Sequence, residues 1–159
     1  MKRKLVYVPT YSRLDLMMAS PTEPMPEASR RHQLTRMWGG LAAIERGAAP
    51  STDDWRVCSD AVNLMESLVT DGYMQDAHGL LADAVQALAQ AGRRHLAGGS
   101  IRLDAAGIQA VRAVLEDYAA ALAQIDHRSM LFAHRRTEAR IREIHQGRKR
   151  PHDVEVMAL

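Results

Sequence analysis

The sequence has one cysteine, few aromatic residues and no long apolar run. A single cysteine, Cys58, excludes an intramolecular disulfide and gives no sign of an oxidising compartment. No segment approaches the roughly 18 apolar residues of a membrane span. Pro9, Arg13 and Asp15 interrupt the apolar start of the chain, so it lacks the central region of a signal peptide. These absences predict a cytoplasmic protein with no membrane contact.

Several signatures of catalysis are also missing. The chain contains no GxSxG, HExxH or GxxxxGK[ST] motif. Cys58 lies on an apolar helical stripe, where a small core residue is expected. The scattered acids Asp53, Asp60 and Asp71 are typical of helix caps and solvated faces. We therefore predict no enzymatic activity, no catalytic residue and no cofactor.

The histidines do not have the spacing of a metal site. His127 and His134 lie two helical turns apart, whereas two ligands on one helix are normally three or four residues apart. Asp126 beside His127 does not correct this spacing. We predict no metal ligand, and we expect His78 and His95 to be surface residues.

The residues that are present favour a single helical domain. The chain has 159 residues, of which 47% are hydrophobic, 25% charged and only 4% aromatic. This length is typical of one domain and sufficient for a sizeable core. Few aromatics and many Ala, Leu and Arg residues favour helices over strands. Composition shifts divide the chain into an extended or flexible arm (1–26), a helical bundle (27–146) and a basic tail (147–159).

Hydrophobic periodicity predicts four helices and leaves a fifth open. The first runs from about residue 26 to 46, and the second starts after a cap at Ser51 or Thr52 and stops at Gly72. A third follows almost at once and ends before Gly98, and Asp104 caps the fourth. After Ile125 the helix either continues with a rotated face or a new one starts near residue 127. The predicted fold is an antiparallel bundle of four or five helices.

The strongest periodicity is a heptad stripe in the fourth helix. Its positions are Ile108, Val111, Leu115, Tyr118, Leu122 and Ile125. Such a stripe is usually the inner face of a bundle helix, and it also suits a dimer seam. Alanines at 119–121 would allow a second close contact, so a homodimer and a monomer stay equally open. In the first helix, Gly39 and Gly40 indicate close packing by a neighbouring helix, or a kink.

Positive charge gathers at the two ends of the chain. The start, "MKRK", holds three basic residues, and residues 127–152 hold eight against two acids. Phosphate contacts of this kind drive binding to DNA or RNA through counterion release. The candidate nucleic-acid-binding residues are Arg135, Arg136, Arg140, Arg142, Arg148, Lys149 and Arg150. The alternative interpretation is the solvated end of a helix, because no aromatics interleave to stack bases.

The hairpin at 62–84 superficially matches a helix-turn-helix motif. Its turn contains a glycine, but both helices are long, and the outward face of the second carries Asp76 and Asp83 rather than basic side chains. A recognition helix needs donors for bases and phosphates. The hairpin is therefore interpreted as bundle core.

The segment "WGGLAAIERGAAPSTDDWRVCSDAVNLMESL" resembles a loosely defined group of small proteins from proteobacterial mobile elements and prophages. The shared features are a basic start, a G-A-x-x-x-x-D approach to a helix and an N-x-x-E-x-L pattern. The resemblance implies a phage or plasmid accessory protein, and some members are labelled transcriptional regulators. It supplies no functional residues.

Together these observations predict a non-enzymatic regulatory or accessory protein that contacts nucleic acid through its basic termini. The alternative is a protein-binding module, an inhibitor or adaptor that docks on a host protein through a helix face. In that case the basic tail would confer solubility or steer an acidic partner.

Overall fold

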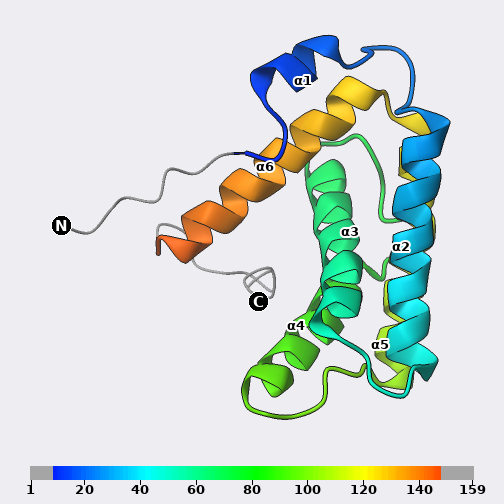
Figure 1. Cartoon of the computed structure of the whole chain (residues 1–159), viewed down its shortest axis with the longest axis vertical. Helices are drawn as coiled ribbons and strands as arrows, with labels where there is room; N and C mark the ends of the chain where they lie inside the picture. The colour runs from blue at the N-terminus through cyan, green and yellow to red at the C-terminus, as the bar shows by residue number, and fades with distance from the viewer. Residues whose placement is uncertain (1–8, 148–159) are drawn as a thin grey trace.

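The computed structural model describes residues 9–147 (Figure 1). Within this range the chain forms six helices and no strand, which confirms the all-α prediction. The helices are α1 (Arg13–Met18), α2 (Glu27–Arg46), α3 (Thr52–Thr70), α4 (Leu81–Leu96), α5 (Ala105–Gln124) and α6 (His127–His145). No helix among these residues is long and apolar enough to cross a bilayer.

Helices α2 to α5 form an antiparallel bundle in which α3 packs against each of the other three. Helix α6 crosses the bundle diagonally and packs against α3, and the short α1 lies on α6 (Figure 1). One large core cluster fills the bundle, and a small second cluster joins Leu16 and Ala19 of the N-terminal segment to Leu131 of α6.

Helix α3 is the central element, and its start has the predicted chemistry. The Ser51 hydroxyl accepts a hydrogen bond from the Asp54 backbone, and the Asp54 carboxylate accepts one from the Ser51 backbone, which makes a capping box. One turn later, the Trp55 indole is buried and donates to the Leu88 carbonyl of α4 at 3.1 Å. The hydrogen bond satisfies the polar atom of a large core side chain and fixes α3 against α4.

The two glycines of α2 have different surroundings. Gly40 is buried, and a Cβ placed there would lie 2.8 Å from the Asp54 carbonyl oxygen and closer still to a methyl group of Val57. Gly39 is exposed and has nothing within 4 Å of the same position. The close packing expected from this pair is therefore present, and Gly40 alone is responsible for it.

The heptad stripe of α5 is the inner face of the bundle. Ile108 is partly buried. The other five members are buried: Val111, Leu115, Tyr118, Leu122 and Ile125. The stripe therefore packs within the chain along its whole length.

The structure corrects the predicted start of the third helix. Residues 71–80 form turns, and α4 begins only at Leu81. The Asp76 carboxylate accepts hydrogen bonds from the backbone N–H groups of Leu80 and Leu81, and Gly79 takes a positive φ of 64°. Asp76 thus supplies hydrogen-bond acceptors for backbone amides at the start of α4. The spacing of apolar residues does not reveal this role.

The structure also decides between the two predictions for residues 125–135. Helix α5 ends at Gln124, Ile125 is extended, and Asp126 caps a new helix by accepting from the Ser129 amide at 2.9 Å. The amides of His127 and Arg128 donate to the carbonyls of Glu23 and Ser20. A segment from the N-terminal arm therefore completes the cap of α6.

The described part of the arm, residues 9–26, is folded onto the domain and is not extended throughout. Ser12 and Asp15 form a capping box that starts α1, although this helix has only six residues. Leu16 is buried, whereas Leu14, Met17 and Met18 are 66%, 73% and 78% exposed. The arm therefore buries Leu16 against α6 and leaves an apolar surface of Leu14, Met17 and Met18 exposed.

Candidate functional site

The described arginines of α6 divide into two groups by the face of the helix on which they lie. On the flank that faces α3, Arg136 lies 2.8 Å from the Asp71 carboxylate, and Arg140 lies 3.1 Å from Glu66. Arg140 also donates to the carbonyl of Asn63 at 3.4 Å. These two predicted nucleic-acid contacts thus take part in holding α6 to the C-terminal half of α3.

The second group lies on one side of α6. Arg128, Arg135 and Arg142 are spaced by seven residues, so they share a face of the helix at intervals of two turns. Arg128 donates to the carbonyls of Leu16, Met17 and Ala19 and so fixes α1. The row of positive charge is continued by Arg135 and Arg142, both partly exposed.

The remaining predicted contacts, Arg148, Lys149 and Arg150, lie outside the described residues, as does the "MKRK" start. The structure therefore brings Arg135 and Arg142 together on one face and places Arg136 and Arg140 on another.

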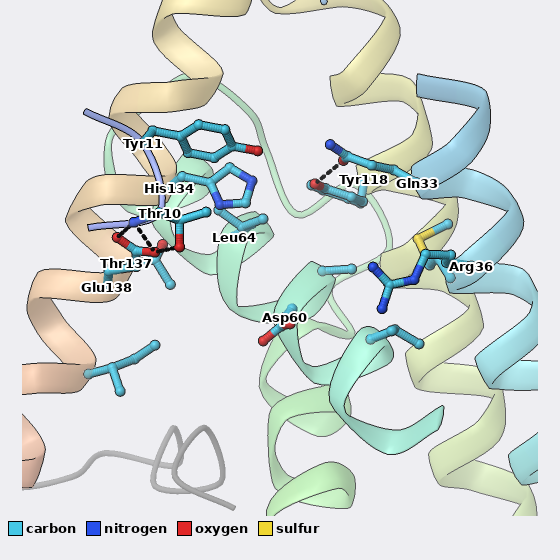
Figure 2. A pocket seen from close by; sticks show the side chains of 14 residues that line it. Thr10, Tyr11, Gln33, Arg36, Asp60, Leu64, Tyr118, His134, Thr137 and Glu138 are labelled. Atoms are coloured by element: carbon cyan, nitrogen blue, oxygen red, sulfur yellow. Dashed lines mark hydrogen bonds between the residues drawn. The ribbon is translucent and has the colours of Figure 1, made fainter. Parts of the chain in front are cut away.

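A pocket of about 360 Å³ lies between α6 and the bundle (Figure 2). Its walls come from α2, α3, α5, α6 and the segment just before α1, so five parts of the chain converge on it. The apolar lining is Met37, Val57, Ala61, Leu64 and Ile141, and the polar lining is Thr10, Tyr11, Gln33, Arg36, Asp60, Tyr118, His134, Thr137 and Glu138.

The α6 side of the pocket is closed by the N-terminal segment. The Glu138 carboxylate accepts hydrogen bonds from the backbone N–H and the hydroxyl of Thr10. The Tyr11 ring meets the His134 ring edge-on, with centroids 5.1 Å apart and planes at 76°. Figure 2 shows these two rings one above the other along α6 and directed toward the open part of the pocket.

His134 is neutral in this position. Burial lowers the pKa of its imidazole to about 4, and the Glu138 carboxylate offsets the effect only in part. Its Nε2 atom is shielded from solvent and has no hydrogen-bond partner among the described residues. A buried polar atom without a hydrogen-bond partner lowers the stability of the fold, and such an atom is therefore a candidate for a functional role.

The opposite side of the pocket carries a buried phenol and two charged groups. The Tyr118 hydroxyl donates to the Gln33 side-chain oxygen at 3.3 Å, and burial raises the pKa of this phenol, with Tyr11 and Asp60 adding to the rise. Asp60 and Arg36 lie lower in the pocket (Figure 2) and are both reached by solvent. Enclosure by the walls nonetheless raises the pKa of the Asp60 carboxyl, and Arg56 and Arg36 offset that rise in part. Water enters the recess while protein surrounds it, so the carboxylate is accessible and incompletely solvated.

Sequence reasoning missed this pocket. The sequence pattern suggests a solvated acid at Asp60, and it presents His134 only as a possible metal partner of His127. Spacing within α6 places His134, Glu138 and Ile141 on one face, but no pattern in the sequence reveals that α2, α3 and α5 meet that face.

The structure contains no cluster of three or more His, Cys, Asp or Glu side chains suited to a metal, within the residues it describes. Cys58 is buried in the core, and burial raises the pKa of its thiol to about 12. A thiol that stays protonated is a poor nucleophile.

Searches of protein-family models, curated proteins and solved structures find no match to this chain.

Proposed function

We propose that the protein is a non-enzymatic regulatory or accessory protein, of the kind carried by phages and plasmids, that contacts nucleic acid through the face of α6 that carries Arg135 and Arg142 and through the basic residues beyond this helix. The observation that supports this proposal is the row formed by Arg135 and Arg142. In the sequence, three further basic residues follow α6: Arg148, Lys149 and Arg150.

The geometry suits contacts to phosphates rather than to base edges. Two turns of helix separate Arg135 from Arg142 by roughly 10 Å along the axis, so the two guanidinium groups can reach different phosphates. Helix α6 is fixed to the domain by Arg136, Arg140 and the cap of residues 20–23, so the row is presented on a rigid element. Binding of this type is weakly selective for sequence and strongly dependent on salt.

The test is a DNA-binding titration over a range of salt concentrations. Replacing Arg135 and Arg142 with alanine is expected to weaken binding. It should also reduce the slope of log K against log salt by about 1 for each phosphate that the variant no longer neutralises. The matched control replaces Arg31 and Arg46, two exposed arginines of α2, with alanine and so removes the same charge.

A second control separates the helix from the tail. A chain that ends at Gly147 keeps the row on α6 but lacks the residues beyond it. Equal loss of affinity in the α6 variant and the α2 control would contradict a defined interface. The same holds if the unmodified chain shows no salt-dependent binding.

The alternative function, docking on a host protein, is supported by a different observation. Leu14, Met17 and Met18 form an exposed apolar surface on α1, and methionine-rich surfaces adapt to partners. The guanidinium of Arg128, which contacts the Met17 carbonyl, and the exposed Arg13 border this surface. The corresponding partner would present an apolar groove with an acidic rim. In that case the unmodified chain would show no DNA binding, and replacing Met17 with glutamate would abolish partner binding.

A further inference from the structure

The pocket beside α6 has the size of a small-molecule site, and nine of its fourteen lining residues are polar. Binding pockets in proteins are usually 300–1,000 Å³, mainly apolar, and contain a few convergent polar groups. At about 360 Å³, with five apolar side chains and polar groups from four helices, this pocket lies at the lower end of that range. It would hold a compact ligand.

The charges in the pocket are unbalanced toward the negative. Among the described residues of the lining, Asp60 and Glu138 contribute two carboxylates and Arg36 contributes one guanidinium. Arg56 does not line the pocket, although its charge also acts on Asp60. His134 adds no positive charge because it is neutral. Pocket walls surround the Asp60 carboxylate although solvent reaches it, and it has no hydrogen bond or ion pair within the described part of the chain, so a cationic partner would stabilise it.

Two tyrosines add a second attraction for positive charge. Tyr11 and Tyr118 line opposite sides of the pocket (Figure 2). The faces of phenol rings attract cations, most strongly where solvent is excluded. Both rings and both carboxylates belong to different elements, so the folded domain alone brings them together.

We propose that this pocket binds a small organic cation: a compound with an ammonium or guanidinium group on an apolar body. The cationic group would pair with Asp60, and the apolar body would lie against Leu64 and Ile141 between the two tyrosines. This inference concerns a site separate from the row on α6 and does not depend on nucleic-acid binding.

The experiment uses the full chain, labelled with ¹⁵N, and three probes with one common apolar body. Tyramine carries an ammonium group, tyrosine carries both an ammonium and a carboxylate, and 4-hydroxyphenylpropionate carries only a carboxylate. Each is titrated at pH 7.5 while amide resonances are followed. Tyramine is expected to shift resonances of the pocket residues, and 4-hydroxyphenylpropionate is expected not to.

Two substitutions identify the recognised charge, and they are expected to act in opposite directions. Asp60→Asn removes the partner of the cation and is expected to weaken tyramine binding by about tenfold or more. Arg36→Met removes a repulsive charge and is expected to strengthen it. The control, Asp83→Asn, removes an exposed carboxylate on α4, outside the pocket, and should leave the affinity unchanged.

Asp60 and Arg36 are both exposed, so neither substitution threatens the fold, and circular dichroism verifies this. The proposal is overturned if tyramine shifts no pocket resonance, or if Asp60→Asn and Asp83→Asn have equal effects. It is also overturned if tyrosine binds more tightly than tyramine and loses that advantage in Arg36→Met. That result would assign the site to a zwitterion.

Discussion

Replacing Gly39 and Gly40 with alanine, one at a time, tests how closely α2 approaches α3. Alanine is favoured over glycine inside a helix by roughly 0.8–1.0 kcal/mol. At Gly39 the new methyl group meets nothing within 4 Å, so Gly39→Ala is expected to stabilise the protein by nearly that amount. The two variants share the same change in helix propensity, and only their surroundings differ.

At Gly40 the new methyl group would lie 2.8 Å from the Asp54 carbonyl oxygen and press on Val57. A backbone atom cannot rotate away, so the two helices must separate. Overpacking of this kind typically costs about 1–3 kcal/mol, which cancels or exceeds the gain in propensity. We expect Gly40→Ala to be less stable than Gly39→Ala by about 1–3 kcal/mol.

Urea denaturation followed by circular dichroism measures both variants. A difference of 1 kcal/mol corresponds to about 2–4 °C in Tm for a chain of this size, so thermal unfolding gives a second reading. If Gly40→Ala is as stable as Gly39→Ala, the inference of a close contact between α2 and the first turns of α3 is wrong.

Three further predictions concern buried polar groups. His134 has a folded-state pKa of about 4 against 6.5, so only the unfolded chain binds its proton as the pH falls between these values. Stability should therefore drop by up to about 3 kcal/mol over that window, and urea titrations of His134→Phe should show a shallower drop. Cys58 should react with a thiol reagent only at the rate of global unfolding, and fast labelling of the native protein would contradict its burial. The Ser67 and Thr137 hydroxyls lie 2.6 Å apart between α3 and α6, so Thr137→Val should cost about 1–2 kcal/mol. Adding Ser67→Ala to Thr137→Val should lower the free energy of unfolding by little more. If the losses of the two single variants add, the two hydroxyls are not coupled.

The helices were largely predictable because their signals are local. Ser51 with Asp54 and the glycine at 72 mark the bounds of α3 in the sequence itself, and the bounds follow from capping chemistry. The stripe of α5 predicted its buried face for the same reason. Local signals were less informative at the start of α4, where apolar spacing suggested an earlier helix start than the one observed and Asp76 accepts hydrogen bonds from the Leu80 and Leu81 amides.

The candidate sites depended on distant contacts, which a single sequence does not specify. Arg136 and Arg140 look equivalent to Arg135 and Arg142 in the sequence because all four lie in one basic stretch. Only the position of α3 distinguishes them, since Asp71 and Glu66 lie against one flank of α6. The pocket was hidden for the same reason, because its walls come from segments up to about 130 residues apart.

The attachment of the N-terminal segment to α6 affects the order in which the chain can fold during synthesis. Thr10 and Glu138 are 128 residues apart, and Arg128 is 112 residues from its partner Leu16. At roughly 5–20 residues per second, a ribosome needs on the order of ten seconds to make the residues between them. Throughout that interval α1 has no α6 to pack on, and Leu16, which is buried against Leu131 in the folded protein, is available to other proteins. The bundle of α2 to α5 can form first, and the packing of α1 on α6 and the pocket between α6 and the bundle are completed at the end.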